Sequence, residues 1–245
     1  MTVKKILISQ QTPLNTTPFN NLTEKYGVEI DFRPFFVIQP LTSREFRAQR
    51  INLLDYSAVV FSSRHAIDAY FNLAEDLRVK IPETMKYFCT TEAVAMYLQK
   101  HIVYRKRKIF FGDGTPKSVT DLIGTKHKGE KFLITTSDSS NADSMTKLFD
   151  VQGLEYTAAV FVKSVSQDLK ELQLNTYDLV VFYNPSDVKS LYENFPEFKQ
   201  GDLKFISYGK SIVKAMEDAG LEIAVKAPSP EYHSVSSAIE AYLKA

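Results

Sequence analysis

The sequence contains few of the residues on which disulfide-stabilised and metal-binding proteins depend. Cys89 is the single cysteine among 245 residues, which excludes an internal disulfide and a thiolate metal cage and favours a reducing compartment. The histidines are scattered without the spacing of metal ligands: His65, His101, His127 and His233. We therefore expect no metal site.

The sequence also lacks an excess of charge and a long apolar run. A net charge of +1 favours neither nucleic acid nor a membrane surface as a partner. No apolar stretch approaches the length that spans a bilayer, and the opening MTVKKILIS does not resemble a signal peptide. These absences predict a cytoplasmic protein.

The stretch Tyr56–Phe71 predicts one unit of an α/β sheet. Ala58–Phe61 is an unbroken apolar run, as expected for a buried strand, and it is followed by the helix-capping residues Ser62 and Ser63. Apolar residues then recur with helical spacing: Ala66, Ile67, Tyr70 and Phe71. Ligands bind such sheets where strands end and helices begin, because backbone N–H groups are free there.

The same pattern returns later in the chain. Tyr177–Leu191 aligns with the first copy, and shorter matches in the same order relate Lys5–Leu7 to Lys131–Leu133 and Lys86–Phe88 to Lys204–Ile206. These matches indicate an internal duplication. The alternative is that buried strands of α/β proteins resemble one another, since Val and Ile dominate them.

Two long extended runs, Val28–Ile38 and Glu155–Val165, predict how the copies form domains. Pro34 interrupts the first run and argues against a central strand. We predict two Rossmann/flavodoxin-like parallel-sheet domains, joined by a two-stranded β connector, with the chain crossing between them. The predicted ranges are 1–32 plus 166–245 for domain 1, 39–156 for domain 2, and 33–38 and 157–165 for the connector strands. Helices are expected at Thr42–Leu54 and Gln167–Leu172.

Four segments, by their order and spacing, resemble the uroporphyrinogen-III synthase family over nearly the whole chain. They are Val59–Ser63 with Ala66, Val180–Ser186, Phe205–Ser211 with Ala215 and Gly220, and Ala227–Pro230. The resemblance implies the strand-exchanged fold and a lyase without a cofactor that acts as a monomer in haem biosynthesis. The implied reaction closes hydroxymethylbilane, a linear tetrapyrrole with eight carboxylates, with loss of water and inversion of ring D.

The resemblance also implies a proton donor for the leaving hydroxide. In the family a connector Tyr is considered for this role, but Val162 occupies the matching position, beside Phe161. Tyr208 is the candidate catalytic residue here, and Tyr183 is a second candidate phenol.

Substrate carboxylates require hydrogen-bond donors, which free N–H groups at helix N-termini supply. Six turns qualify: residues 10–12, 62–64, 90–92, 137–139, 184–186 and 209–211. The candidate substrate-binding residues in these turns are Gln10, Ser62, Ser63, Arg64, Thr90, Thr91, Ser137, Asn184, Ser186, Gly209, Lys210 and Ser211. The alternative for each hydroxyl is that it only caps a helix. The alternative for Lys210 is that it is an ordinary solvated lysine on the surface.

Other functions remain open at this stage. The main alternative is a non-catalytic, two-lobed ligand-binding or regulatory protein of the same fold. A receiver-type phosphorelay protein would need acidic residues at the strand ends, which Ser9-Gln10 and Ser62-Ser63 do not provide. No phosphate-binding glycine loop supports a nucleotide-dependent enzyme. The basic run Arg105–Lys108 could bind an anion or RNA, but a solvated segment at the start of a strand explains it better.

Overall fold

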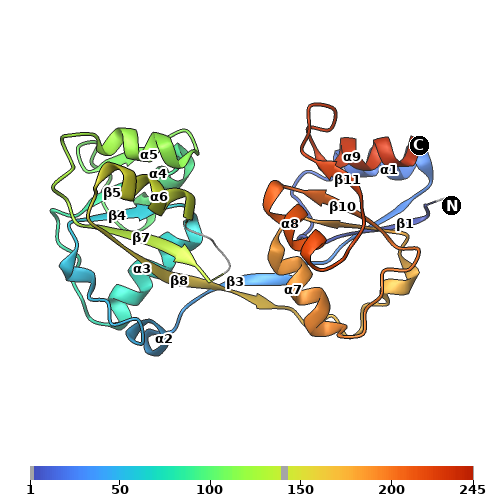
Figure 1. Cartoon of the computed structure of the whole chain (residues 1–245), viewed down its shortest axis with the longest axis horizontal. Coiled ribbons are helices and arrows are strands. Elements are labelled where there is room, and N and C mark those ends of the chain that lie inside the picture. The colour runs from blue at the N-terminus through green and yellow to red at the C-terminus, as the bar shows by residue number, and fades with distance from the viewer. Residues whose placement is uncertain (1–2, 139–142, 245) are drawn as a thin grey trace. The chain divides into compact units, whose positions relative to one another are not determined.

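The computed structural model describes residues 3–138 and 143–244, and within them the chain divides into two compact units. Unit 1 comprises residues 1–37 and 165–245, and unit 2 comprises residues 38–164. Each unit is an α/β structure built on a largely parallel sheet, as the sequence predicts (Figure 1).

The sheet of unit 1 has the strand order β11-β10-β9-β1-β2. Its helices are α1, α7, α8 and α9. The elements are β1 (Lys5–Ile8), α1 (Thr17–Tyr26), β2 (Glu29–Phe32), β9 (Leu179–Phe182), α7 (Pro185–Asn194), β10 (Lys204–Tyr208), α8 (Lys210–Asp218), β11 (Ile223–Ala227) and α9 (Val235–Lys244). In Figure 1, α1 and α9 lie above this sheet and α7 lies below it.

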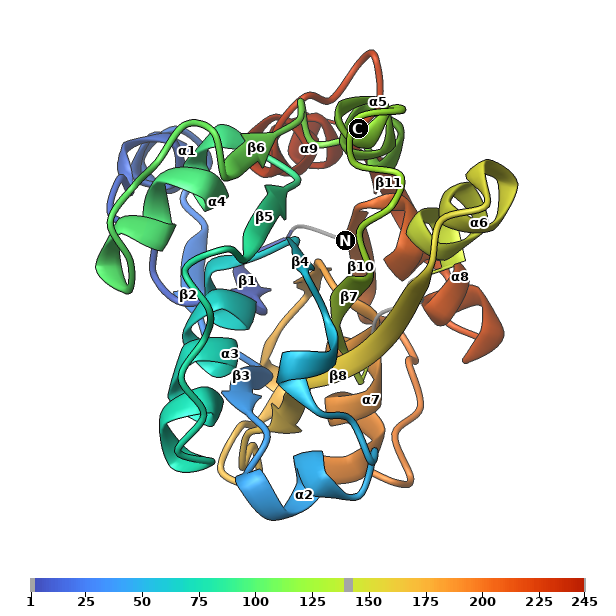
Figure 2. The ribbon, with the colours of Figure 1, turned by 90° about the vertical axis from the view of Figure 1, so that its left-hand side faces the viewer.

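The sheet of unit 2 has the order β3-β8-β7-β4-β5-β6. Figure 2 shows α3 and α4 on one side of it and α5 and α6 on the other. The elements are β3 (Phe36–Pro40), α2 (Ser43–Arg47), β4 (Ala58–Phe61), α3 (Arg64–Asp76), β5 (Lys86–Cys89), α4 (Glu92–Tyr97), β6 (Ile109–Phe111), α5 (Pro116–Ile123), β7 (Phe132–Ser137), α6 (Asp143–Gln152) and β8 (Tyr156–Ser166).

The sheets are completed by exchange of strands between the two halves of the chain. β1, from the first half, pairs in parallel with β9, with Leu7 opposite Val180. β7, from the second half, pairs in parallel with β4, with Leu133 opposite Val59. The predicted crossing of the chain is therefore confirmed, and each unit contains strands of both halves.

Each sheet is covered on both faces by apolar side chains. In unit 1, α7 and α8 pack on the face that carries Leu7, Val180 and Phe205. The opposite face carries Ile6 and Val181 and packs against residues of α1 and α9. Because successive strand residues point to opposite faces, this alternation fixes the face of every polar residue that continues a strand.

The structure agrees with the prediction for Pro34 and corrects two predicted helices. Pro34 lies in the break between β2 and β3, and both of these strands are at sheet edges. The helix predicted at Thr42–Leu54 is too long, because α2 ends at Arg47, although its predicted capping box between Thr42 and Glu45 is present. The helix predicted at Gln167–Leu172 is wrong. The backbone N–H of Leu169 is bonded instead to the Asn194 side chain at 2.8 Å.

Candidate functional site

The predicted site residues lie at the carboxyl edges of the two sheets. In unit 1 they follow β1, β9 and β10: Gln10, Asn184, Ser186, Gly209, Lys210 and Ser211. In unit 2 they follow β4 and β5 or end β7: Ser62, Ser63, Arg64, Thr90, Thr91 and Ser137. Each unit thus gathers its own set along one edge, where parallel strands place helix N-termini side by side.

Two hydroxyl groups on the unit 2 edge cap helices. Ser63 Oγ accepts a hydrogen bond from the Ala66 N–H of α3 at 3.1 Å, and Thr91 Oγ1 accepts one from the Val94 N–H of α4 at 3.3 Å. The capping role considered from the sequence is therefore present at both positions. A capping hydroxyl acts as an acceptor toward its helix, so its own proton remains available to a ligand.

The neighbouring turns of unit 2 are linked to one another. Thr90 Oγ1 donates to the carbonyl of exposed Ser62 at 3.4 Å, which joins the turns after β4 and β5. Arg64 is exposed, and its guanidinium lies 5.5 Å from the centre of the Tyr97 ring. No carboxylate partner of Arg64 is found among the described residues, so this cation can meet an anionic ligand.

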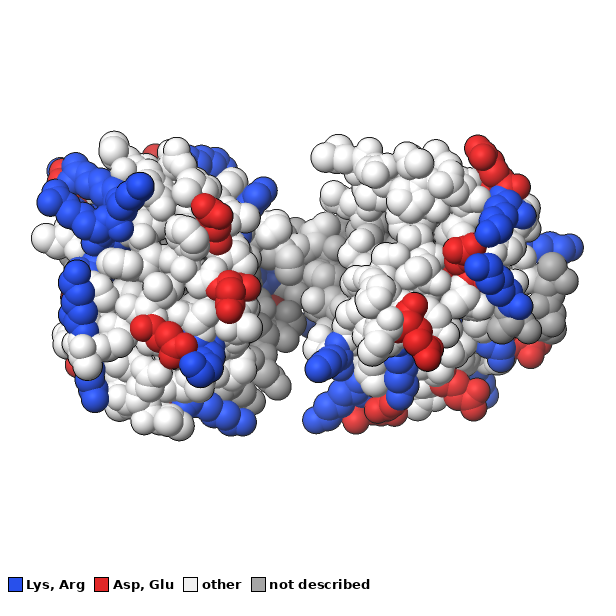
Figure 3. All heavy atoms as spheres, turned by 90° about the horizontal axis from the view of Figure 1, so that it is seen from above, with Lys and Arg blue, Asp and Glu red and all other residues white. Residues whose placement is uncertain are grey.

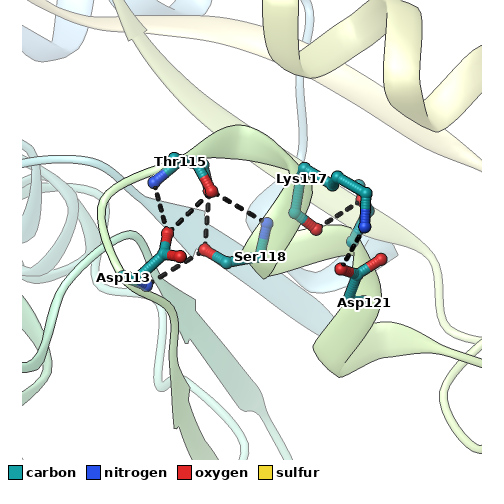
Figure 4. A network of polar contacts seen from close by, with 6 residues as sticks. Asp113, Thr115, Lys117, Ser118 and Asp121 are labelled. Atoms are coloured by element: carbon teal, nitrogen blue, oxygen red, sulfur yellow. Dashed lines mark hydrogen bonds and ion pairs between the residues drawn. The ribbon is translucent and has the colours of Figure 1, made fainter.

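The loop between β6 and α5 lies on the same edge, although it was not predicted as part of the site. The Gly114 N–H donates to the Thr90 carbonyl at 2.8 Å. In Figure 4, Asp113 Oδ1 accepts from the N–H and the hydroxyl of Thr115, and the Asp113 N–H donates to Ser118 Oγ. Hydrogen bonds from the Thr115 side chain and N–H lower the pKa of Asp113 to about 2, so this carboxyl is ionised at neutral pH. The sequence signal for this hydrogen-bonded turn is the pattern Asp-x-Thr directly before a helix.

The turn after β7 is described only in part. Ser137 is half-buried and ends the strand. Asp138 is exposed, and its Oδ1 accepts from the Ser164 N–H of β8 at 2.9 Å. Ser139, which the sequence placed in the same donor turn, lies outside the described residues.

On the unit 1 edge, helix α8 begins without a side-chain cap. Its N-cap residue is Gly209, with φ at +129°, a backbone conformation that favours glycine. Lys210 and Ser211 open the helix and are exposed. Uncapped N–H groups beside a lysine form an anion-binding arrangement, so this turn fits a carboxylate.

The start of α7 is different, because a buried carboxylate occupies it. Asp187 is 0 % exposed, and its Oδ2 accepts from the N–H groups of Tyr183 at 2.8 Å and Asn184 at 2.9 Å. Asn184 Oδ1 in turn accepts from the Ser186 N–H at 3.0 Å. Asp187 was not among the predicted site residues, although an Asn followed three residues later by an acid is a capping-box signal.

Burial raises the pKa of Asp187 to about 6, against the smaller opposing effect of hydrogen bonds from Tyr183 and Asn184. Ser9 lies near enough to lower this pKa slightly, yet neither Ser9 Oγ nor Asp187 Oδ1 completes a hydrogen bond of normal geometry. Two further buried hydroxyls, those of Ser186 and Ser207, also have no partner.

The candidate phenols are in different situations. The Tyr208 hydroxyl donates to the His233 carbonyl at 3.1 Å. The Tyr183 ring lies 5.5 Å from that of Tyr208, and burial raises the pKa of its phenol. Phe161 and Val162 are buried in the core of unit 2, so the connector offers no proton donor at these positions.

The surface away from these edges carries charges of both signs. On the face in Figure 3, each unit carries both basic and acidic side chains, separated by wide uncharged areas. Within the described part of the chain, no three His, Cys, Asp or Glu side chains converge as a metal site. None of the described helices has both the length and the apolar character that a membrane crossing requires.

The fold defines a two-unit α/β protein with exchanged strands, in which helix N-termini gather at the carboxyl edge of each sheet. Two solved structures resemble it over nearly their whole length. Uroporphyrinogen-III synthetase from Helicobacter pylori is 15 % identical, with 98 % of this chain and 99 % of that chain covered and a TM-score of 0.59. A mutant uroporphyrinogen III synthase from Thermus thermophilus is 14 % identical, with 98 % of both chains covered and a TM-score of 0.56.

The model of the family described as uroporphyrinogen-III synthase HemD matches residues 18–236. The chain therefore belongs to the uroporphyrinogen-III synthase family, and its function is that of an enzyme in haem biosynthesis. This confirms the main interpretation of the sequence, and no observation favours the non-catalytic alternative. No curated protein sequence matches the chain.

Proposed function

We propose that the protein is a lyase that converts hydroxymethylbilane into uroporphyrinogen III with loss of water. Membership of the family supports this proposal most directly. The edges of the two sheets support it chemically, because they offer many hydrogen-bond donors and few cations. Such a surface suits a substrate with many carboxylates that must be held while a reactive cation forms and ring D inverts.

Within this proposal, the turns of both units bind substrate carboxylates. The strongest candidates are the uncapped start of α8, with Gly209, Lys210 and Ser211, and exposed Arg64 at the start of α3. Ser62, Ser63, Thr90, Thr91 and Ser137 add hydroxyl groups in unit 2, and Gln10 adds an exposed amide in unit 1. Asn184 and Ser186 contribute less, because the Asn184 side chain caps α7 and Ser186 is buried.

Tyr208 is the proposed proton donor. Its phenol is already a hydrogen-bond donor, toward a backbone carbonyl, so it can redirect the same proton to the leaving hydroxide. The C–O bond breaks with its electron pair on oxygen, the phenol proton completes water, and the proton released at the final ring closure restores the phenol. Tyr183 is the second candidate.

The remaining expectations belong to the same proposal. The protein acts as a monomer in the cytoplasm, and it needs neither a cofactor nor a metal. Cys89 takes no part, because burial raises the pKa of its thiol to about 12 and removes it from thiolate chemistry.

A coupled assay tests the proposed reaction. Hydroxymethylbilane is generated by its upstream synthase, the protein is added, and the products are oxidised and separated as porphyrin isomers. We expect predominantly the type III isomer, with the type I isomer in a control without the protein. Type I product alone in both reactions would contradict the proposal and favour a binding protein of the same fold.

A further inference from the structure

The start of α7 combines a buried carboxylate with buried hydroxyls that lack partners. Asp187 Oδ1, Ser9 Oγ, Ser186 Oγ and Ser207 Oγ are all inaccessible to solvent and without a hydrogen bond. Ser9 lies two residues after Leu7, and Ser207 two residues after Phe205, so both continue the sheet face on which α7 packs. Ser9 lies close enough to Asp187 to affect its pKa, so these two groups form the centre of a buried polar cluster at the α7 turn.

This cluster can exist with or without a proton. As a carboxylate, Asp187 is acceptor-only, and a negative charge is buried without a cation. When Oδ1 is protonated it can donate to one of the hydroxyls, while Oδ2 still accepts from the amides of Tyr183 and Asn184. The turn keeps its hydrogen bonds in both forms, so only the charge changes.

Among the described residues, no charged side chain acts on this equilibrium. The described groups that act on the Asp187 carboxyl are the hydroxyl of Ser9, which follows β1, and the backbone amides of Tyr183 and Asn184. From β10 comes Ser207, which pairs with Phe182. α8 packs here with apolar Ile212 and Met216. Tyr183 is a titratable neighbour, and burial raises the pKa of its phenol, which keeps it protonated.

The uncapped start of α8 follows β10, and the start of α7 follows β9, the adjacent strand of the same sheet. β9 and β10 are paired, and a Cβ placed on Gly209 would lie 3.7 Å from the Tyr183 carbonyl. Neighbouring strands are about 4.8 Å apart, so an anion at the α8 turn lies within reach of the Asp187 field. Two negative charges this close disfavour each other, and the buried one can be discharged by a proton.

We propose that Asp187 is a positioning residue that couples substrate binding to proton uptake: it is protonated when a substrate carboxylate binds at the α8 turn. The proposal rests on the proposed function and adds an assignment to it. In unit 1 the substrate carboxylate binds at Gly209–Ser211, and the α7 turn is filled by the protein's own carboxylate.

Binding measurements test this coupling without turnover. Uroporphyrin, which carries the same type of carboxylate side chains, is titrated into the protein by calorimetry at pH 6.5 in buffers of different ionisation enthalpy. We expect the wild-type protein to take up protons on binding and Asp187→Asn to take up fewer. Asp218→Asn, which removes an exposed acid at the end of α8, should behave as wild type.

Kinetics supply a second readout. One pKa unit of coupling corresponds to a limiting tenfold change in affinity, so KM for hydroxymethylbilane should rise several-fold, up to about tenfold, between pH 5.5 and 7.5 in the wild-type protein. The slope should flatten in Asp187→Asn, with kcat much less affected. Equal proton uptake or an equal KM slope in wild type and Asp187→Asn would overturn the proposal, as would absence of porphyrin binding.

A third measurement needs no variant. Carbon-13 spectroscopy of labelled aspartate in the wild-type protein reports the pKa of Asp187 directly, and uroporphyrin should raise it. An unchanged pKa would overturn the coupling. If proton-coupled binding is found but no type III product forms, the proposed enzyme activity fails while the binding inference stands.

Discussion

The Asp178 carboxylate accepts a hydrogen bond from the backbone N–H of Lys5 at 2.9 Å, across 173 residues of sequence. The same oxygen accepts from the Lys4 N–H at 2.7 Å. In unit 2 the Lys131 N–H donates to Ser57 Oγ at 3.0 Å. Lys131 matches Lys5 in the internal repeat and Ser57 matches Asp178. Each exchanged strand is therefore fastened at its start by the residue that precedes the central strand of its sheet.

Replacing Asp178 should loosen the exchanged strand β1. Asp178→Ala removes the acceptor of two backbone N–H groups, and we expect it to lower the free energy of unfolding by about 1–3 kcal/mol. Ser57→Ala removes one neutral acceptor and should cost about 1 kcal/mol. Urea unfolding followed by circular dichroism measures both. Asp202→Ala, at an exposed turn position before β10, is the control, and equal stability of Asp178→Ala and this control would refute the prediction.

The buried carboxylate of Asp187 should make stability depend on pH. Its folded pKa is about 6, above the ordinary value of 3.8, so its contribution to stability is fully present below about pH 4 and is lost as the pH rises through 6. This loss amounts to about 3 kcal/mol. We therefore expect Asp187→Asn to be more stable than wild type at pH 8 and similar to it at pH 4, in thermal or urea unfolding. Lower stability of the variant at pH 8 would contradict the assignment.

Gly112 is required by close packing in the β6–α5 loop. A Cβ at this position would lie 2.1 Å from Ser118 Oγ, so Gly112→Ala must displace the side chain that accepts from the Asp113 N–H. We expect a loss of about 1–3 kcal/mol in unfolding free energy. Gly129→Ala is the matched control, because a Cβ there meets no atom within 4 Å. A loss of similar size in both variants would refute the packing argument.

Tyr208→Phe tests the proposed proton donor. General acid catalysis contributes about 10²–10⁴-fold, so kcat for type III product should fall by at least about tenfold with little change in KM. Tyr26→Phe is the control, since the Tyr26 hydroxyl is also hydrogen-bonded, to Glu240. Tyr183→Phe completes the set. If it alone slows turnover, the donor is Tyr183, and equal rates in all three variants would remove both phenols.

The central strands were predictable because they are short apolar runs. Ala58–Phe61 and Leu179–Phe182 are buried at every position, and their shared pattern revealed the repeat. The crossing of the chain followed from Pro34 and from the length of the two extended runs. Helix lengths were less predictable. Arg50, just beyond α2, has φ at +55°, and the spacing of apolar residues does not predict this backbone conformation.

The candidate site was predictable only as a set of turns. Ser63 and Thr91 were recognisable as caps because Ser and Thr prefer that position before a helix. Asp187 could not be distinguished from a solvated acid, since its burial depends on strands β1 and β10, which are distant in sequence. From the sequence, the turns before α7 and α8 were predicted as equivalent hydrogen-bond donors for substrate carboxylates. Only the folded chain shows that a carboxylate fills one and that the other is uncapped.

The exchange of strands has a consequence for how the chain acquires its structure during synthesis. Residues 38–164 of unit 2 are contiguous and are complete before the ribosome has made β9. β1 and β2 emerge first and are neighbours, but β9, which pairs with the other side of β1, is translated much later. One edge of the apolar strand β1 therefore stays open to aggregation while the other unit folds, so slow translation or chaperone binding in this interval would affect unit 1 selectively.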